Sequence, residues 1–271
     1  MLKDITIGQY IPGDTFVHKL DPRTKIILTM LYITSLFIIN KFVGYILIVF
    51  FLGAAIINSK VPIRFILKGL KPIFILIIVN GILNLFMIKG SEETLVFHFK
   101  FIDIYIEGIR SALFMSLRLI FLIVGTSLLT LTTSPMELTD SIEKLLRPIG
   151  KERAHELAMM MTIALRFIPT LTEELDKIMK AQKARGANFE TGNIIQRAKS
   201  LIPLLVPLFI SSFRRADELS MAMESRCYRG GTGRTRMKEL KYTKNDVIAF
   251  SIFTIIFVGS FIIRFIDVGL V

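Results

Sequence analysis

Residues 26–57, IILTMLYITSLFIINKFVGYILIVFFLGAAII, decide the fold of this chain. Apolar residues run almost without interruption on both sides of one polar dipeptide, Asn40-Lys41. The core of a bilayer is about 30 Å thick and takes roughly 17–25 helical residues, since each backbone polar group inside it needs a partner within the chain. The stretch therefore predicts two short membrane helices, Ile26–Ile39 and Phe42–Ile57, joined by a tight turn.

Three further apolar segments have the length and composition of membrane helices. They are Ile73–Ile88, Ser111–Leu131 and Val247–Val268, and each is bounded by charged residues, proline or glycine. Together with the first two, they predict an all-α, polytopic membrane protein with five transmembrane helices.

Charged residues gather between the fourth and the fifth apolar segment. Residues 132–245 contain 20 of the 34 Lys and Arg residues and 13 of the 22 Asp and Glu residues. We therefore expect three parts in this chain. Residues 1–131 form an N-terminal arm with four transmembrane helices, residues 132–245 form a cytoplasmic domain, and residues 246–271 form a C-terminal transmembrane helix.

The short connections predict the orientation, because positively charged loops stay in the cytoplasm. The N-terminal arm and residues 58–72 are rich in basic residues, whereas the turn at Lys41 has one and residues 89–110 carry more acidic than basic residues. The basic residues on the inner side are Lys3, Lys19, Arg23, Lys25, Lys60, Arg64, Lys68 and Lys71. This alternation predicts a multi-pass protein of the cell membrane whose 132–245 domain is cytoplasmic.

Composition argues against several classes of site. The formal net charge is +12, but the Lys and Arg residues flank apolar segments and do not alternate with aromatic residues, so we expect no nucleic-acid partner. Cys227 is the only cysteine, and the three histidines lack metal-ligand spacing. We expect no disulfide within the chain, no bound metal and no cofactor.

The 132–245 domain is predicted to consist of amphipathic helices. A short helix begins near Ser134, and two long helices follow, Lys151–Arg185 and Asn193–Arg226, joined by a flexible stretch over residues 187–193. Prolines within the long helices predict bends, and they are Pro169, Pro203 and Pro207. The apolar stretch Leu201–Phe213 is short and contains two of these prolines, which suits an interfacial or protein-packed helix better than a sixth span.

The two long helices end alike. Each end places an arginine between two small residues, as Ala184-Arg185-Gly186 and, 41 residues later, as Ser225-Arg226-Cys227. Small neighbours leave the guanidinium free to form a forked contact with carboxylate or carbonyl groups of a partner. The alternative is that each arginine only complements the negative end of the helix dipole, and the pattern alone leaves both interpretations open.

The chain resembles a known family over nearly its whole length, that of the energy-coupling factor transporter T components, EcfT. The resemblance rests on the stretches Tyr10–Asp14, His18–Lys25, Arg166–Pro169, Ala181–Gly186 and Ser225–Cys227. It implies a membrane subunit of an importer of the ATP-binding-cassette superfamily, which takes up a vitamin or a metal. Such a subunit is not an enzyme, because its partners hydrolyse the ATP.

For the site, the resemblance implies that each Ala-Arg-Gly-like motif ends a coupling helix and docks in a groove of one of two cytoplasmic ATPases. The first motif matches fully as Ala184, Arg185 and Gly186. The second, Ser225, Arg226 and Cys227, has other small residues in place of Ala and Gly, which leaves its fine packing open. The helices would pass ATP-driven motion to an exchangeable, membrane-embedded S component that binds the substrate.

Two other classes of function stay open on the residues alone. A self-sufficient permease needs polar residues near the middle of the membrane, and the spans offer Asn80, Asn84 and Arg118. We favour hydrogen bonding between helices for the asparagines, and pairing or snorkelling for Arg118. An intramembrane enzyme needs paired catalytic groups within the spans, which are not seen. The stretch Gly230–Thr235 lacks the spacing of a phosphate-binding loop, so we expect no nucleotide site.

Overall fold

The computed structural model describes residues 10–88, 95–99, 102–187, 189, 193–230 and 239–265. Contacts within the chain divide these residues into two compact units. The first, which we call the membrane unit, comprises residues 10–134 and 239–265, and the second, which we call the helical-pair unit, comprises residues 135–230.

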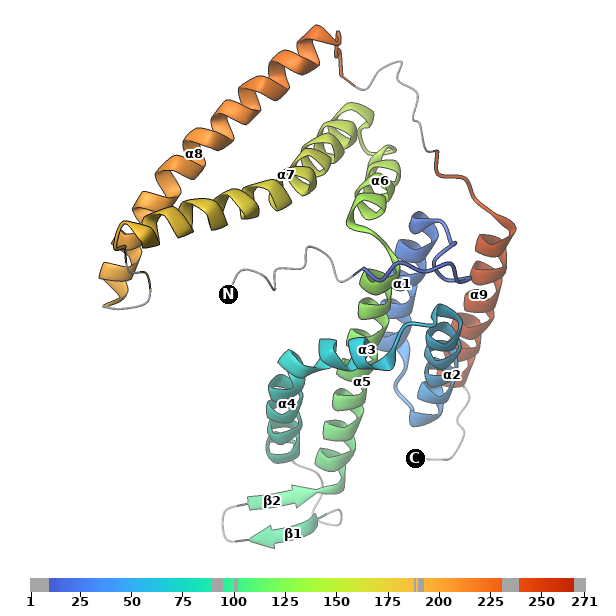
Figure 1. Cartoon of the computed structure of the whole chain (residues 1–271). Helices are drawn as coiled ribbons and strands as arrows, with labels where there is room; N and C mark the ends of the chain where they lie inside the picture. The colour runs from blue at the N-terminus through green and yellow to red at the C-terminus, as the bar shows by residue number, and fades with distance from the viewer. Residues whose placement is uncertain are drawn as a thin grey trace. The chain divides into compact units, whose positions relative to one another are not determined.

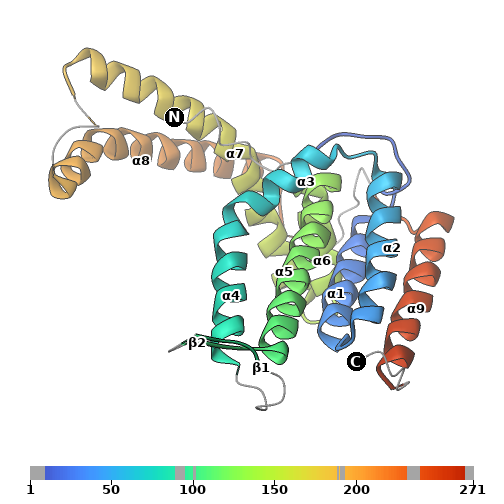
Figure 2. The same cartoon turned by 90° about the horizontal axis from the view of Figure 1, so that it is seen from below.

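The membrane unit consists mainly of helices (Figures 1 and 2). They are α1 (Pro22–Ile38), α2 (Phe42–Ser59), α3 (Ile63–Leu70), the 3₁₀ turn η1 (Lys71–Ile73), α4 (Phe74–Met87), α5 (Ile106–Thr132) and α9 (Lys244–Phe265). Four stretches of the described chain are long and apolar enough to cross a membrane: Phe42–Ser59, Ile63–Met87, Ile106–Thr132 and Lys244–Ile263. The predicted all-α, polytopic membrane fold is confirmed.

The first predicted membrane helix is the shortest. It corresponds to α1, which has 17 residues and is therefore not among the four stretches long enough to cross. Its residues nevertheless form the centre of the membrane unit, because Tyr32 and Leu36 are buried in one core with Ile48 of α2 and Phe253 of α9. The Tyr32 hydroxyl donates a hydrogen bond to the Phe121 carbonyl of α5 over 2.8 Å.

A short antiparallel hairpin was not predicted from the sequence. Strands β1 (Leu95–Phe99) and β2 (Ile102–Tyr105) pair in the connection between α4 and α5, with Phe99 opposite Ile102. Both strands are rich in β-branched and aromatic residues, which is the usual signal for a strand. The charge of this connection predicts the side of the membrane on which it lies and carries no information about strand pairing.

A polar junction holds together the end of the membrane unit at which α1 and α9 begin. The Asp246 carboxylate, almost fully buried, accepts hydrogen bonds from the Asp21 backbone N–H at 2.8 Å and from the Thr243 backbone N–H at 2.7 Å. Asp21 in turn pairs with Arg23 at 2.8 Å, and this hydrogen-bonded carboxylate raises the pKa of Arg23. Lys25 lies at the same end and donates to the Thr132 carbonyl, where α5 ends, over 2.8 Å.

Helix α4 packs along α5 through small and polar residues. The Asn84 side-chain amide donates to the Asn80 carbonyl at 2.9 Å, and Ser111 of α5 donates to Asn84 at 3.4 Å. At Gly108 of α5, an added Cβ would lie 2.9 Å from the Leu85 carbonyl, so only glycine allows this approach. The structure thus shows the two asparagines in hydrogen bonds within and between helices.

The helical-pair unit contains α6 (Pro135–Leu146), α7 (Lys151–Ala184) and α8 (Ile194–Ser225). The two long helices match the predicted ones within a residue or so at each end, and Figures 1 and 2 show that α8 runs in the opposite chain direction to α7. Arg215 of α8 pairs with Glu174 of α7 at 2.8 Å. The three predicted prolines lie inside these helices, Pro169 in α7 and Pro203 and Pro207 in α8.

Candidate functional site

The end of α7 is a Schellman motif, in which two backbone N–H groups turn back to satisfy carbonyls of the last turn. The Gly186 N–H donates to the Lys183 carbonyl at 3.0 Å, and the Ala187 N–H donates to the Gln182 carbonyl at 3.0 Å. Gly186 has φ +86°, the left-handed conformation that a glycine at a helix end adopts without strain. Arg185 is the residue immediately before it and occupies the C-cap position.

The end of α8 repeats this backbone geometry. The Cys227 N–H donates to the Glu224 carbonyl at 2.8 Å, and the Tyr228 N–H donates to the Met223 carbonyl at 3.0 Å. Arg226 occupies the C-cap position, and Cys227 takes the left-handed conformation with φ +55°. The third motif position is therefore a backbone requirement, which glycine meets without strain and cysteine meets at a cost of about 1–2 kcal/mol.

Both arginines are available to a partner. The six predicted site residues are all exposed, namely Ala184, Arg185, Gly186, Ser225, Arg226 and Cys227. Within the part of the chain that the structure describes, neither the Arg185 nor the Arg226 guanidinium forms a hydrogen bond or an ion pair with another residue. Each arginine follows the last turn of its helix, so its charge also complements the negative end of the helix dipole. That interaction needs only a positive charge and does not use the planar fork of donors of the guanidinium.

The antiparallel arrangement places the two motifs at opposite ends of the helical pair. Arg226 lines a groove with Met159, Thr162 and Arg166, which belong to the first half of α7. Arg185 follows the last residue of α7, a helix of 34 residues that is about 50 Å long. The sequence predicted two similar helix ends, and the structure separates them by most of the length of α7.

The α8 end is tied to the start of α7 by residues that sequence reasoning missed. The Tyr228 hydroxyl lies 3.5 Å from His155 Nε2, and His155 Nδ1 lies 3.4 Å from the carboxylate of Glu143 in α6. Glu143 is almost fully buried and also pairs with Arg147 at 3.3 Å. Only the position of Tyr228, two residues after Arg226, could have drawn attention to it, because its partner His155 lies 73 residues away.

Helix α8 also carries an exposed apolar face. Ile202, Val206, Phe209 and Phe213 recur every three or four residues, so they share one side of the helix, and each is more than half exposed. This part of α8 is not among the stretches of the described chain that are long and apolar enough to cross a membrane. The predicted interfacial or protein-packed role of Leu201–Phe213 is compatible with this surface.

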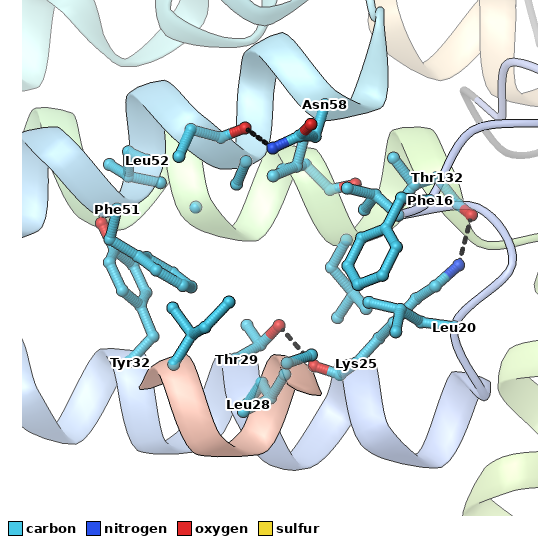
Figure 3. Close-up of a pocket in the computed structure, with 18 residues that line it drawn as sticks. Phe16, Leu20, Lys25, Leu28, Thr29, Tyr32, Phe51, Leu52, Asn58 and Thr132 are labelled. Atoms are coloured by element: carbon cyan, nitrogen blue, oxygen red, sulfur yellow. Dashed lines mark hydrogen bonds between the residues drawn. The ribbon is translucent and has the colours of Figure 1, made fainter. Parts of the chain in front are cut away.

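The membrane unit contains an apolar cavity of about 170 Å³ among α1, α2, α5 and α9 (Figure 3). Its polar side chains are engaged with backbone carbonyls: Asn58 donates to Ala54, Thr29 to Lys25, and Lys25 to Thr132. Pockets for small-molecule ligands usually measure about 300–1,000 Å³ and present convergent polar groups. This cavity has neither property, so it does not resemble a substrate site.

Arg118 lies inside α5 and serves the packing of the membrane unit. Its guanidinium donates to the Ile39 carbonyl at the end of α1 over 3.1 Å and lies 5.1 Å from the centre of the Phe114 ring. This is the paired arrangement that the sequence favoured. Among the described residues, no cluster of three His, Cys, Asp or Glu side chains could hold a metal ion.

Comparison with known proteins places these features in context. A family model described as cobalt transport protein, CbiQ, matches residues 13–238. The energy-coupling factor transporter transmembrane protein EcfT of Clostridium kluyveri is 66% identical over 251 residues, which are 92% of this chain and 93% of that protein. A protein of the same name from Thermosediminibacter oceani is 57% identical over 98% of this chain and 100% of its own length. Another from Bacillus subtilis is 46% identical over 91% of this chain and 93% of its own length.

Proposed function

This chain belongs to the EcfT family of energy-coupling factor transporter transmembrane proteins, and from that premise we propose that it transmits ATP-driven motion to a substrate-binding membrane partner. It is a multi-pass component of a transporter in the cell membrane. In the proposed function, two cytoplasmic ATPases of the ATP-binding-cassette type hydrolyse ATP, and this chain carries no catalytic group.

The observation that carries the proposal is that two exposed arginines, without a partner in the described chain, lie at opposite ends of the pair formed by α7 and α8. Arg185 and Arg226 share the same C-cap geometry, and each is exposed and unpaired within the described chain. A separation of most of the length of α7, about 50 Å, lets one chain reach two separate proteins. A forked, charge-assisted contact from each guanidinium would hold the helix end in a groove of its ATPase.

The proposed movement follows from this geometry. When the two ATPases close on ATP, they would draw the ends at Arg185 and Arg226 together, and α7 and α8 would shift against one another. Each proline inside these helices removes one backbone hydrogen bond, which makes bending easier at Pro169, Pro203 and Pro207. We therefore propose that residues 132–245 act as a cytoplasmic coupling domain between the membrane parts 1–131 and 246–271.

The exposed apolar face of α8 supports contact with the membrane-embedded S component. Ile202, Val206, Phe209 and Phe213 form a continuous apolar strip, of the kind that covers a partner helix in a groove. Choice of the vitamin or metal would belong to that partner, so several S components could use one such strip in turn.

The competing hypothesis is a permease with its own substrate path. Asn80, Asn84 and Arg118, which the sequence offered for such a path, are engaged in hydrogen bonds of the helix packing. The cavity of Figure 3 is apolar. Both observations favour the coupling function.

The test is the double variant Arg185→Glu with Arg226→Glu. We expect the chain to insert in the membrane normally, but to lose co-purification of the ATPases and ATP-dependent uptake of the substrate of its S component. The matched control is Lys177→Glu with Lys199→Glu, which makes the same charge change at exposed positions outside both motifs. Full uptake by the arginine variant, or equal loss in the control, would contradict the proposal.

A further inference from the structure

Helix α3 differs from the other helices of the membrane unit in direction and in surface. Figures 1 and 2 both show it set at a steep angle to α4, with the change of direction at η1, which contains Pro72. Helix α4 has 14 residues and is about 21 Å long, which is less than the roughly 30 Å core of a bilayer. The core nevertheless disfavours the charges of Arg64, Lys68 and Lys71, so α3 is expected at the level of the lipid headgroups.

One face of α3 is fixed against α5. Ile66 is buried in a cluster with Leu131, near the end of α5. One turn later, an added Cβ at Gly69 would lie 3.0 Å from the Ser127 hydroxyl of α5. The chain leaves α5 at Thr132 and enters residues 135–230, so α3 lies at the end of the bundle from which the helical-pair unit begins.

The opposite face of α3 carries a row of positive charge. Arg64, Lys68 and the C-cap residue Lys71, which keeps a helical backbone, are four and three residues apart, so they fall on one side of the helix, roughly opposite Ile66. All three are exposed. Apolar side chains flank the row, with Phe65 44% exposed and Leu67 57% exposed.

We propose that Arg64 and Lys68 of α3, together with its C-cap residue Lys71, form a binding surface for anionic phospholipid headgroups of the cytoplasmic leaflet. A short helix with a basic row between exposed apolar side chains is suited to a membrane interface, because the apolar groups enter the acyl region while the cations stay at the phosphates. The charge of the surface selects an anionic lipid over a zwitterionic one. The basic residues and the apolar side chains of Phe65 and Leu67 are exposed on this face, so lipid can reach it.

The assignment to the cytoplasmic leaflet rests on the proposed function, since that function places residues 132–245 in the cytoplasm. The lipid preference itself does not. It can be measured on the full chain in vesicles without ATPases or an S component, so loss of lipid preference and loss of coupling are separate outcomes.

The chain contains no tryptophan, which permits a local probe. In the variant Phe65→Trp, the single indole lies beside the basic row. We would reconstitute it in phosphatidylcholine vesicles that contain bromine-labelled phosphatidylglycerol or, in a parallel sample, bromine-labelled phosphatidylcholine. We expect stronger quenching by the labelled phosphatidylglycerol, corresponding to a preference of about five-fold per engaged charge, and we expect salt to weaken it.

Removal of the row should abolish this preference. We expect Phe65→Trp combined with Arg64→Gln, Lys68→Gln and Lys71→Gln to be quenched equally by the two labelled lipids. The matched control adds Lys177→Gln, Lys180→Gln and Lys199→Gln, which lowers the net charge equally on α7 and α8, and it should keep the preference.

Three results would overturn the proposal. Equal quenching by both lipids before removal of the charges would show no selectivity, and loss of the preference in the control would make it a property of the net charge. Absence of quenching by either lipid would show that protein, such as a second copy of the chain, covers α3. Lipids that co-purify with the unmodified chain give an independent readout, since phosphatidylglycerol should be enriched over the membrane of origin.

Discussion

Cys227 and Gly186 occupy equivalent positions, and the comparison explains why the two motifs differ in sequence but not in shape. Both residues have positive φ and both close a Schellman motif after an arginine. A side chain in this conformation costs about 1–2 kcal/mol, which cysteine bears and glycine avoids. The departure of the second motif from Ala-Arg-Gly therefore changes the stability of the helix end and leaves the placement of Arg226 unaltered.

This difference predicts that substitutions at the two positions change the rate of amide hydrogen exchange in opposite directions. Gly186→Ala should loosen the end of α7, and the amide hydrogen of Ala187 should exchange about ten-fold faster for a cost near 1.4 kcal/mol. Cys227→Gly should slow the exchange of the Tyr228 amide hydrogen, because it removes the strain of the left-handed conformation. The change should be less than ten-fold, because glycine also gains conformational freedom in the unfolded chain. Hydrogen exchange read by mass spectrometry measures both. Equal changes in the two variants would mean that backbone conformation is not what distinguishes these positions.

Among the elements, α1 and α9 show how a residue far along the chain completes a helix end. Asp246 caps its own helix through Thr243 and reaches the Asp21 N–H at the start of α1, 225 residues away. The sequence predicted both helices but not their contact. The sequence pattern carries no information on which helix starts are neighbours, because helix caps are local and this hydrogen bond is not.

We expect Asp246→Ala to destabilise the membrane unit, because it leaves the buried Asp21 N–H and the Thr243 N–H without their acceptor. The expected loss is about 2–4 kcal/mol, combining a buried charged hydrogen-bond acceptor with its unsatisfied donors. Thermal unfolding of the purified chain in detergent would show it as a lower Tm. Asp246→Asn keeps one acceptor oxygen and should lose less, so a larger loss in the asparagine variant would argue against this account.

For the whole molecule, the arrangement of charge across the membrane is the property that the proposal depends on. Asn40 is exposed in the turn between α1 and α2, and Cys227 is exposed at the end of α8. The alternation of basic and other connections predicts that these two residues lie on opposite sides of the bilayer.

A membrane-impermeant maleimide tests this in intact cells. We expect Asn40→Cys in a Cys227→Ser background to be labelled from outside, whereas the native Cys227 should be labelled only after the cells are opened. Because Cys227 is the single cysteine of the chain, each variant reports one position. Labelling of Cys227 in intact cells would reverse the orientation and exclude cytoplasmic ATPases as partners of Arg226.

The sequence by itself determined the membrane helices, the two long helices after residue 150 and the Arg-centred ends at residues 184–186 and 225–227. These features depend on local physics: the run of apolar residues, the turn residue with positive φ and the position of proline. Only the tertiary structure decided that the two arginines lie at opposite ends of one antiparallel pair. It also showed that Tyr228 meets His155 and that the charges of α3 face away from the bundle. Packing between distant segments decides such relations, because neither contact partner nor helix direction is written in the spacing of residues along the chain.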